Sequence, residues 1–176
     1  MNVESLVEKF GRLPYANVGP GVDDALWAAD FLPQVNDFLS TYPLVARDAD
    51  YVDFLVNFGG ASLEDPDRNL IVDILGFSAV STRLLDMDGP VVDEDGFLLF
   101  AQCISHVIID GALRDTIEYS FAFDVTGYRR PGVYSLFSSF SVRGGVYDWS
   151  VGGFSFWLER LTGRLEHFAG GVCVYE

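Results

Sequence analysis

The sequence predicts an α+β fold in one domain, because three features of the pattern agree. Apolar residues recur at helical spacing up to Gly60, alternate with period two after it, and return to helical spacing near residue 153. Helices that precede a run of strands favour a mostly antiparallel or mixed sheet with helices packed on it. The length of 176 residues fits a single domain, 1–176, and no repeat or linker divides it.

The first half of the chain is expected to be helical. The spacing predicts a short amphipathic helix over residues 2–12, followed by a loop over 13–21 that holds two prolines and two glycines. A second helix is expected over 24–40, where Pro33 must kink or divide it because proline lacks an N–H. A third helix is expected over 48–58.

The third helix carries the clearest apolar stripe. Tyr51, Phe54, Leu55 and Phe58 recur at helical spacing, so we expect them in the core. Asp48 suits the cap of its first turn, since a carboxylate accepts the free N–H groups there. The glycine pair that follows can end the helix in the left-handed conformation.

A sheet is expected from residues 70–149, and a closing helix over 153–162. The Asp95-Gly96 and Asp110-Gly111 dipeptides are typical of turns between strands. Residues 117–123 alternate Ile, Tyr, Phe and Phe with small or polar residues, as a half-buried strand does. The predicted strand segments are 70–75, 97–101, 106–109, 116–124, 133–142, 146–149 and, after the last helix, 172–175.

The charge of the chain is strongly one-sided. There are 26 acidic residues and 11 lysines and arginines, which gives a net charge of −15. Such a charge opposes binding to nucleic-acid phosphates and to anionic membranes, and it favours a basic protein partner. Acidity can equally serve only to keep a chain with 15 phenylalanines soluble.

We expect the chain to be cytoplasmic. Its start lacks the basic segment and apolar run of a signal peptide, and no apolar run reaches the length of a membrane span. Cys103 and Cys173 are the only cysteines and do not make a disulfide framework.

No catalytic, cofactor or metal site is expected. Cys103 and His106 are three positions apart on a predicted strand, so they point to opposite faces and cannot pair. His167 has only Glu166 beside it, which is too little for a zinc site. The glycine pairs lack the lysine of a phosphate-binding loop. We therefore expect a chain that is not an enzyme.

Two acidic stretches are the candidate contact surface for a basic partner. The first does not match a calcium-binding loop, because Gly89 and Pro90 stand where ligand and turn residues are needed. The candidate residues are Asp86, Asp88, Asp93, Glu94 and Asp95 in the first stretch, and Glu64, Asp65 and Asp67 in the second.

Two short segments resemble a known family. The run from Asp50 to Gly60, with an acidic-aromatic start, a Phe-Leu pair and a closing Gly-Gly, is similar to the helix-plus-glycine signature of the SUKH superfamily. Ile74-Leu75-Gly76-Phe77 resembles the strand end that follows it in that family. The family's usual Leu-Pro is replaced by Tyr42-Pro43-Leu44, with a longer spacer before Tyr51.

The resemblance implies an α+β domain that works without catalysis. Many bacterial members of this superfamily are immunity proteins that bind and neutralise a toxin from a neighbouring cell, and others regulate cell-wall assembly. A toxin of the nuclease type carries a basic groove that an acidic protein can occupy. The alternatives are a regulatory or scaffold protein on the same fold, and a small-molecule binder or enzyme whose site the sequence does not reveal.

Overall fold

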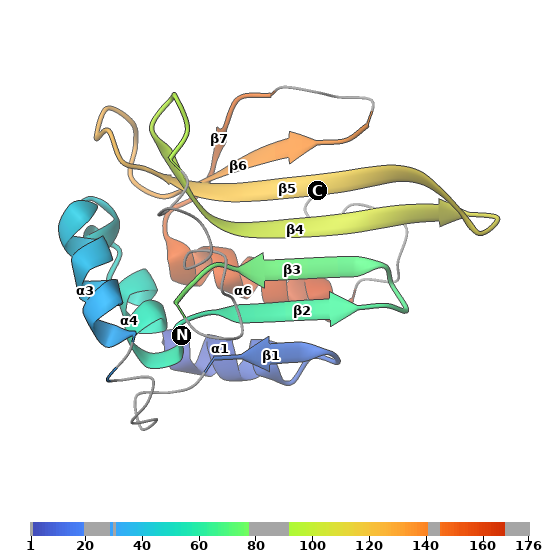
Figure 1. Cartoon of the computed structure of the whole chain (residues 1–176), viewed down its shortest axis with the longest axis horizontal. Coiled ribbons are helices and arrows are strands. Elements are labelled where there is room, and N and C mark those ends of the chain that lie inside the picture. Colours follow the sequence, from blue (N-terminus) through green and yellow to red (C-terminus); the bar gives the residue numbers. More distant parts are fainter. Residues whose placement is uncertain (1, 20–28, 30, 78–91, 141–144, 168–176) are drawn as a thin grey trace.

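Seven strands form one antiparallel sheet, in which each strand lies beside the next one along the chain (Figure 1). The computed structural model describes residues 2–19, 29, 31–77, 92–140 and 145–167. The strands are β1 (Ala16–Val18), β2 (Ala61–Asp65), β3 (Leu70–Ile74), β4 (Phe97–Ile109), β5 (Ala112–Asp124), β6 (Val133–Ser138) and β7 (Asp148–Val151).

Helices α1, α4 and α6 contact one another and lie on one side of the sheet, and α3 lies beside α4 (Figure 1). This arrangement confirms the predicted α+β fold. Among the described residues, no helix is long and apolar enough to cross a membrane. The helices are α1 (Val3–Gly11), α3 (Leu32–Thr41), α4 (Ala49–Phe58) and α6 (Phe154–Leu165), with a 3-10 turn, η1, at Val45–Arg47.

The core lies between these helices and the sheet. Tyr51, Phe54 and Leu55 of α4 are completely buried, as predicted, whereas Phe58 at the end of the helix is half-buried and only packs against the core. Aromatic rings dominate the contacts around Tyr51, and such pairs add to the stability gained from burial alone. The rings that contact one another here belong to Tyr51, Phe54, Phe100, Phe121, Phe123, Phe154 and Trp157.

The two segments that resemble the SUKH signature meet in space. Gly59 ends α4 with a φ of 71°, and its carbonyl accepts a hydrogen bond of 2.6 Å from the N–H of Phe77. A Cβ on Gly76 would lie 1.5 Å from the Gly59 oxygen. Glycine is therefore required at position 76, because the backbones of the two segments touch there.

Some predicted boundaries are wrong. The segments 97–101 and 106–109 belong to one strand, β4, because the polar residues between them stay paired with β5. The expected loop over 13–21 contains β1, and β2 was not predicted at all. In β2 the alternation is hidden, since the buried position at its end is an aspartate, Asp65.

Helix α3 covers the later part of the helix expected over 24–40. It begins at Leu32 and holds Pro33 in its first turn, where a missing N–H costs no hydrogen bond. Of the earlier part of the expected helix, residues 24–28 and 30 lie outside the described residues, as does the predicted strand at 172–175. The last helix matches its predicted start and continues three residues further, to Leu165.

The β4–β5 hairpin extends beyond the rest of the sheet (Figure 1). Its two-residue turn is the predicted Asp110-Gly111, with φ angles of 53° and 73° that suit this type of turn. Pairing with β3 ends at Ser105 and pairing with β6 ends at Glu118, so the outer part of the hairpin is a two-stranded ribbon.

Candidate functional site

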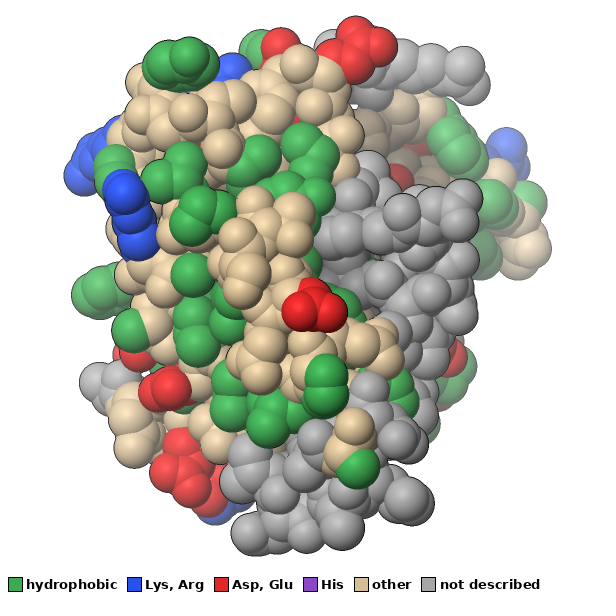
Figure 2. All heavy atoms as spheres, turned by 60° about the vertical axis from the view of Figure 1, so that its left-hand side comes forward, with side chains coloured by type: hydrophobic (Ala, Val, Ile, Leu, Met, Phe, Trp, Pro, Cys, Tyr) green, Lys and Arg blue, Asp and Glu red, His purple; other side chains and the backbone are tan. Residues whose placement is uncertain are grey.

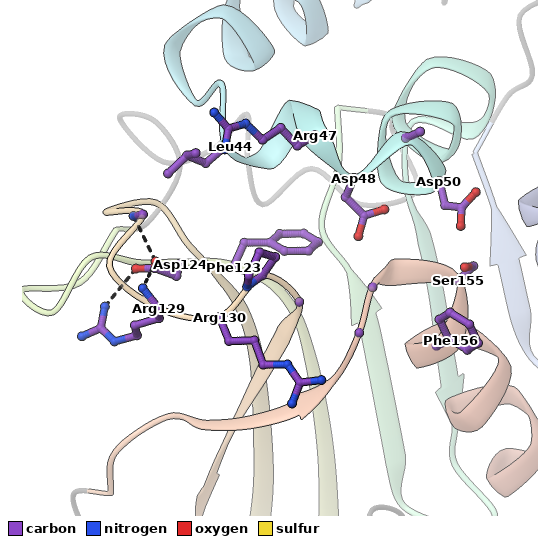
Figure 3. A pocket seen from close by; sticks show the side chains of 16 residues that line it. Leu44, Arg47, Asp48, Asp50, Phe123, Asp124, Arg129, Arg130, Ser155 and Phe156 are labelled. Carbon is purple, nitrogen blue, oxygen red and sulfur yellow. Dashed lines mark hydrogen bonds and ion pairs between the residues drawn. The ribbon is translucent and has the colours of Figure 1, made fainter.

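A pocket of about 400 Å³ lies at one end of the sheet, where four connections meet. They join α3 to α4, the chain before β4 to that strand, β5 to β6, and β7 to α6 (Figure 3). We call this region, residues 44–50, 93–96, 123–132 and 149–156, the pocket end. The pocket itself is lined by residues that include Leu44, Arg47, Asp48, Asp50, Phe123, Asp124, Arg129, Arg130, Pro131, Ser155 and Phe156.

Asp48 joins two helices at the back of the pocket. Its Oδ1 accepts from the Tyr51 N–H at 3.1 Å in the first turn of α4, and its Oδ2 accepts from the Phe154 N–H at 2.8 Å at the start of α6. Gly153 occupies the cap position of α6 and has no side chain to offer, so Asp48 caps both helices.

The pKa of Asp48 is raised. Burial of the carboxyl is the main cause, and it outweighs the backbone hydrogen bonds from Phe154, Tyr51 and Asp50, which lower the pKa. The negative charge of Asp50 adds to the increase. Figure 3 shows the carboxylate of Asp50 above Ser155, whereas that of Asp48 points towards the chain that leads into α6, where it accepts from the Phe154 N–H. The carboxyl of Asp48 is thus fixed by the fold and is not free to serve a ligand.

Asp124 plays a similar part on the opposite wall. Its carboxylate accepts from the backbone N–H groups of Thr126, Gly127 and Arg129, and from the Arg129 guanidinium at 2.9 Å. Burial would raise the pKa of Asp124, but the hydrogen bond from the Thr126 hydroxyl, together with those from the backbone and from Arg129, outweighs it and lowers the pKa. Arg129 also donates to the carbonyl of Asp95 at 3.0 Å. The β5–β6 loop is therefore held to the turn before β4.

Three aromatic side chains at the pocket end are exposed to solvent. Tyr128 is 93% exposed, Phe156 63% and Trp149 37%. The guanidinium of Arg130 lies 3.8 Å from the centre of the Trp149 ring, and the indole N–H donates to the carbonyl of Pro131 at 3.2 Å. Arginine and large aromatic residues are the types enriched at protein interfaces.

Figure 2 shows the side of the molecule that lies on the left in Figure 1. Hydrophobic side chains gather in the middle of this face, and lysine or arginine side chains lie at its edge. Figure 3 shows that the three arginines of the pocket point in different directions. The guanidinium of Arg47 lies above Leu44, and that of Arg130 is directed away from Arg129 and Asp124.

One of the predicted acidic stretches lies at this end. Asp93 builds a turn, because its Oδ1 accepts from the N–H groups of Asp95 and Phe97 at 3.0 and 2.8 Å. Glu94 and Asp95 are exposed beside it. Asp86 and Asp88 lie outside the described residues.

The second acidic stretch lies at the opposite end, and one of its residues needs correction. Asp65 is only 4% exposed, so the expectation that it contacts a partner is wrong. Its carboxylate accepts from the N–H groups of Asp67 and Arg68 and forms an ion pair with the Arg68 side chain. Glu64 and Asp67 are exposed, and Asp67 accepts from the Tyr15 hydroxyl at 2.9 Å.

We call this second region, residues 64–69 and 106–116, the hairpin end. His106 donates its backbone N–H to the carbonyl of Asn69 at 2.9 Å, which places the β2–β3 turn beside the start of the projecting ribbon. The described residues of the first stretch, 93–95, and those of the second, 64–67, therefore lie at opposite ends of the sheet. Each must be considered alone.

The residues that sequence reasoning tested for chemistry remain apart. Cys103 is buried in the core, whereas the ring of His106 lies on the other face of β4, with Nδ1 3.1 Å from the Thr116 hydroxyl. Cys173 lies outside the described residues. Among the residues the structure describes, no group of three His, Cys, Asp or Glu side chains could hold a metal ion.

Sequence reasoning missed the arginine and aromatic residues of the pocket end. Arg129 and Arg130 stand in a loop after a predicted strand, next to the exposed Tyr128, and this cluster could have been noticed as an interface composition. No signal in the sequence indicates that Arg47 or Phe156 would lie near them. Comparisons of the chain with protein-family models, with curated proteins and with solved structures gave no match.

Proposed function

We propose that this chain is a non-catalytic protein-binding domain of the immunity type, which binds and neutralises a bacterial toxin with a basic surface. The observation that carries the proposal is the exposure of Phe156 in the pocket lining, of Tyr128 between two lining residues, and of Trp149 beneath the lining residue Arg130. Exposed aromatic side chains on a fixed loop framework are costly to leave in water, and they are the usual energetic centres of protein interfaces.

The chemistry of the pocket favours binding over catalysis. A general acid or base must be free to exchange a proton with a substrate. The carboxylates of Asp48 and Asp124 are occupied by backbone N–H groups and, for Asp124, by Arg129. These two residues therefore serve the framework of the pocket end rather than a reaction.

The charge of the chain supports a basic partner. A net charge of −15 attracts a cationic protein over distances of about 10 Å at ordinary ionic strength and speeds the encounter. Glu94 and Asp95 lie in the turn held to the β5–β6 loop that carries Tyr128, and they can add to this attraction where the partner docks. A regulatory or scaffold protein would use the same surface, and the activity of the partner separates the two functions.

A capture experiment tests the proposal. The full chain is immobilised and exposed to lysates of strains related to the source, and retained proteins are identified by mass spectrometry. Wild type is compared with the double variant Tyr128→Ala/Phe156→Ala and with Leu113→Ala, which removes an exposed side chain at the hairpin end. We expect one protein to be retained by wild type and by Leu113→Ala and to be lost from the double variant.

The captured protein is then produced in susceptible cells. Growth should stop, and co-expression of the wild-type chain should restore it while the double variant should not. Equal retention by all three proteins would contradict the pocket end as the binding surface. A captured protein that leaves growth unchanged would contradict the immunity role and favour the regulatory or scaffold one.

A further inference from the structure

The lining of the pocket holds equal numbers of basic and acidic side chains, although the chain as a whole is strongly acidic. Three of the eleven basic residues line the pocket, Arg47, Arg129 and Arg130, together with three aspartates. Not all of these charges are available to a partner. Ion pairs and hydrogen bonds within the fold determine which of these charged side chains can still bind a partner.

The carboxylates are largely satisfied within the fold. Asp48 is held by the first turns of α4 and α6, whose N-terminal dipoles favour a negative charge, and Asp124 is paired with Arg129. What remains is the half-buried Asp50 against two arginines, Arg47 and Arg130. Within the described part of the chain, neither of these arginines forms an ion pair.

Arg130 is fixed in a geometry that suits a carboxylate. Its guanidinium carbon lies over the Trp149 ring, 3.8 Å from the ring centre, and the ring is itself held by the hydrogen bond to Pro131. Stacking on an aromatic face leaves the N–H edge of a guanidinium open, and this edge can bind both oxygens of a carboxylate. Because the arginine is held in place, less conformational entropy is lost when a partner binds.

Gly132 allows the Trp149 ring to lie close to the backbone beside Arg130. Gly132 has a φ of 137°, and a Cβ there would lie 2.4 Å from the carbonyl of Val151 and 2.7 Å from the indole nitrogen of Trp149. The close approach that glycine permits therefore sets the position of the Trp149 ring under Arg130. Phe156 and Pro131 add apolar surface on the pocket wall.

We propose that Arg130, stacked on Trp149 at the rim of this pocket, receives a side-chain carboxylate of the partner protein, next to an apolar side chain that enters the pocket. The inference rests on the proposed function and adds a requirement for specificity. Long-range attraction comes from the whole acidic chain, whereas this contact admits only a basic partner that presents an aspartate or glutamate at the right place. A lysine there would face Arg130 and be repelled.

The test uses the full chain, labelled with ¹⁵N, and three probes. These are N-acetyl-Leu-Glu-amide, N-acetyl-Leu-Gln-amide and N-acetyl-Leu-Lys-amide, in which the terminal amide leaves the Glu side chain as the only carboxylate. Chemical shifts of the Trp149 indole N–H and of the Gly153 and Ser155 amides report on the pocket. Wild type is compared with Arg130→Gln and with Arg114→Gln, an exposed arginine at the hairpin end.

We expect saturable shifts with the Glu peptide and at least about fivefold weaker binding of the Gln and Lys peptides, the scale of an exposed but preorganised charged pair. Arg130→Gln should remove this preference, and Arg114→Gln should keep it. Equal binding of the three peptides, a preference that survives Arg130→Gln, or no saturable shift at all would overturn the inference. Each result is independent of the capture experiment, so a failure of the pocket contact is distinguished from a failure of the proposed function.

Discussion

The two ends of the sheet both expose apolar side chains, but in different settings. Exposed aromatic residues occur at both, since Tyr15 and Phe140 are bonded to Asp67 and Asp115 of the hairpin end. The hairpin end presents the aliphatic residues Ile108, Ile109 and Leu113 on a projecting two-stranded ribbon. The pocket end presents aromatic residues around a cavity whose rim holds arginines. Exposure alone therefore does not identify a binding surface, and the combination of a cavity, rigid rings and fixed charges is more informative.

The ends also differ in what a buried aspartate does. At the pocket end, Asp48 links two helices whose bonded residues, Tyr51 and Phe154, are far apart in sequence. At the hairpin end, Asp65 organises its own turn and pairs with Arg68. Burial dominates the pKa of Asp48 and raises it, whereas the hydrogen bonds and ion pair of Asp65 outweigh burial and lower its pKa. The contributions of Asp48 and Asp65 to the free energy of unfolding should therefore change with pH in opposite directions.

The largest effect is expected from the core that both ends share. Phe54→Ala should lower the free energy of unfolding by about 3–5 kcal/mol, because it removes a completely buried ring. Phe156→Ala is the matched control: it deletes the same side chain at the pocket end, where 63% exposure should limit the loss to about 0.5 kcal/mol. Urea denaturation of wild type, Phe54→Ala and Phe156→Ala measures the loss of unfolding free energy in each variant. Similar losses would show that the pocket end is packed like the core.

At the hairpin end, Asp65→Asn should cost about 2–3 kcal/mol at pH 7, since it leaves the half-buried Arg68 without its carboxylate. The folded pKa of Asp65 is lowered, so its contribution is present above the unfolded pKa and is lost as the pH falls through the folded pKa. The difference between wild type and variant should therefore shrink from pH 7 towards pH 3. A difference that is constant over this range would contradict the ion pair as its source.

At the pocket end, Asp48→Asn should cost about 1–2 kcal/mol, because an amide oxygen can replace only one of the two caps. Its pH dependence should be opposite. The folded pKa of Asp48 is raised, so the stability it contributes is fully present below the unfolded pKa and is lost as the pH rises through the folded pKa. The loss should be larger near pH 4 than at pH 7, and parallel curves for Asp48→Asn and Asp65→Asn would remove the contrast between the ends.

Sequence reasoning succeeded where a local pattern carries the information. The stripe of α4 and the turn at Asp110-Gly111 follow from the order of neighbouring residues alone. Asp48 was expected to cap α4, but its second bond, to Phe154, depends on how two distant helices pack. Such a contact has no signature in a single sequence.

The candidate site was predicted less well for the same reason. The acidic stretch around Asp65 was interpreted from its composition, and composition does not indicate which carboxylate turns inward to meet Arg68. The pocket end combines residues from Arg47 to Phe156, and only tertiary structure brings them together. Sequence could have indicated the Tyr128-Arg129-Arg130 cluster, since its composition is local.

The smallest effect is expected from the exposed acids, and it compares the two ends directly. Glu94→Gln/Asp95→Asn at the pocket end and Glu64→Gln/Asp67→Asn at the hairpin end each remove two negative charges from the chain. Asp93 is left unchanged because its carboxylate builds the turn before β4. If the partner docks at the pocket end, the first pair of substitutions should slow association by about two- to threefold at low salt, and the second should change it less.

The measurement is the association rate constant of the captured partner, determined by surface plasmon resonance at low and at physiological ionic strength. Dissociation should be nearly unchanged in both variants, since charges at the rim act mainly on the encounter. Salt should reduce the difference between the variants, because a screened charge near the contact no longer differs from a screened charge far from it. An equal slowing by both pairs would mean that only the net charge of −15 matters, and the acidic turn beside the aromatic residues would lose its special role.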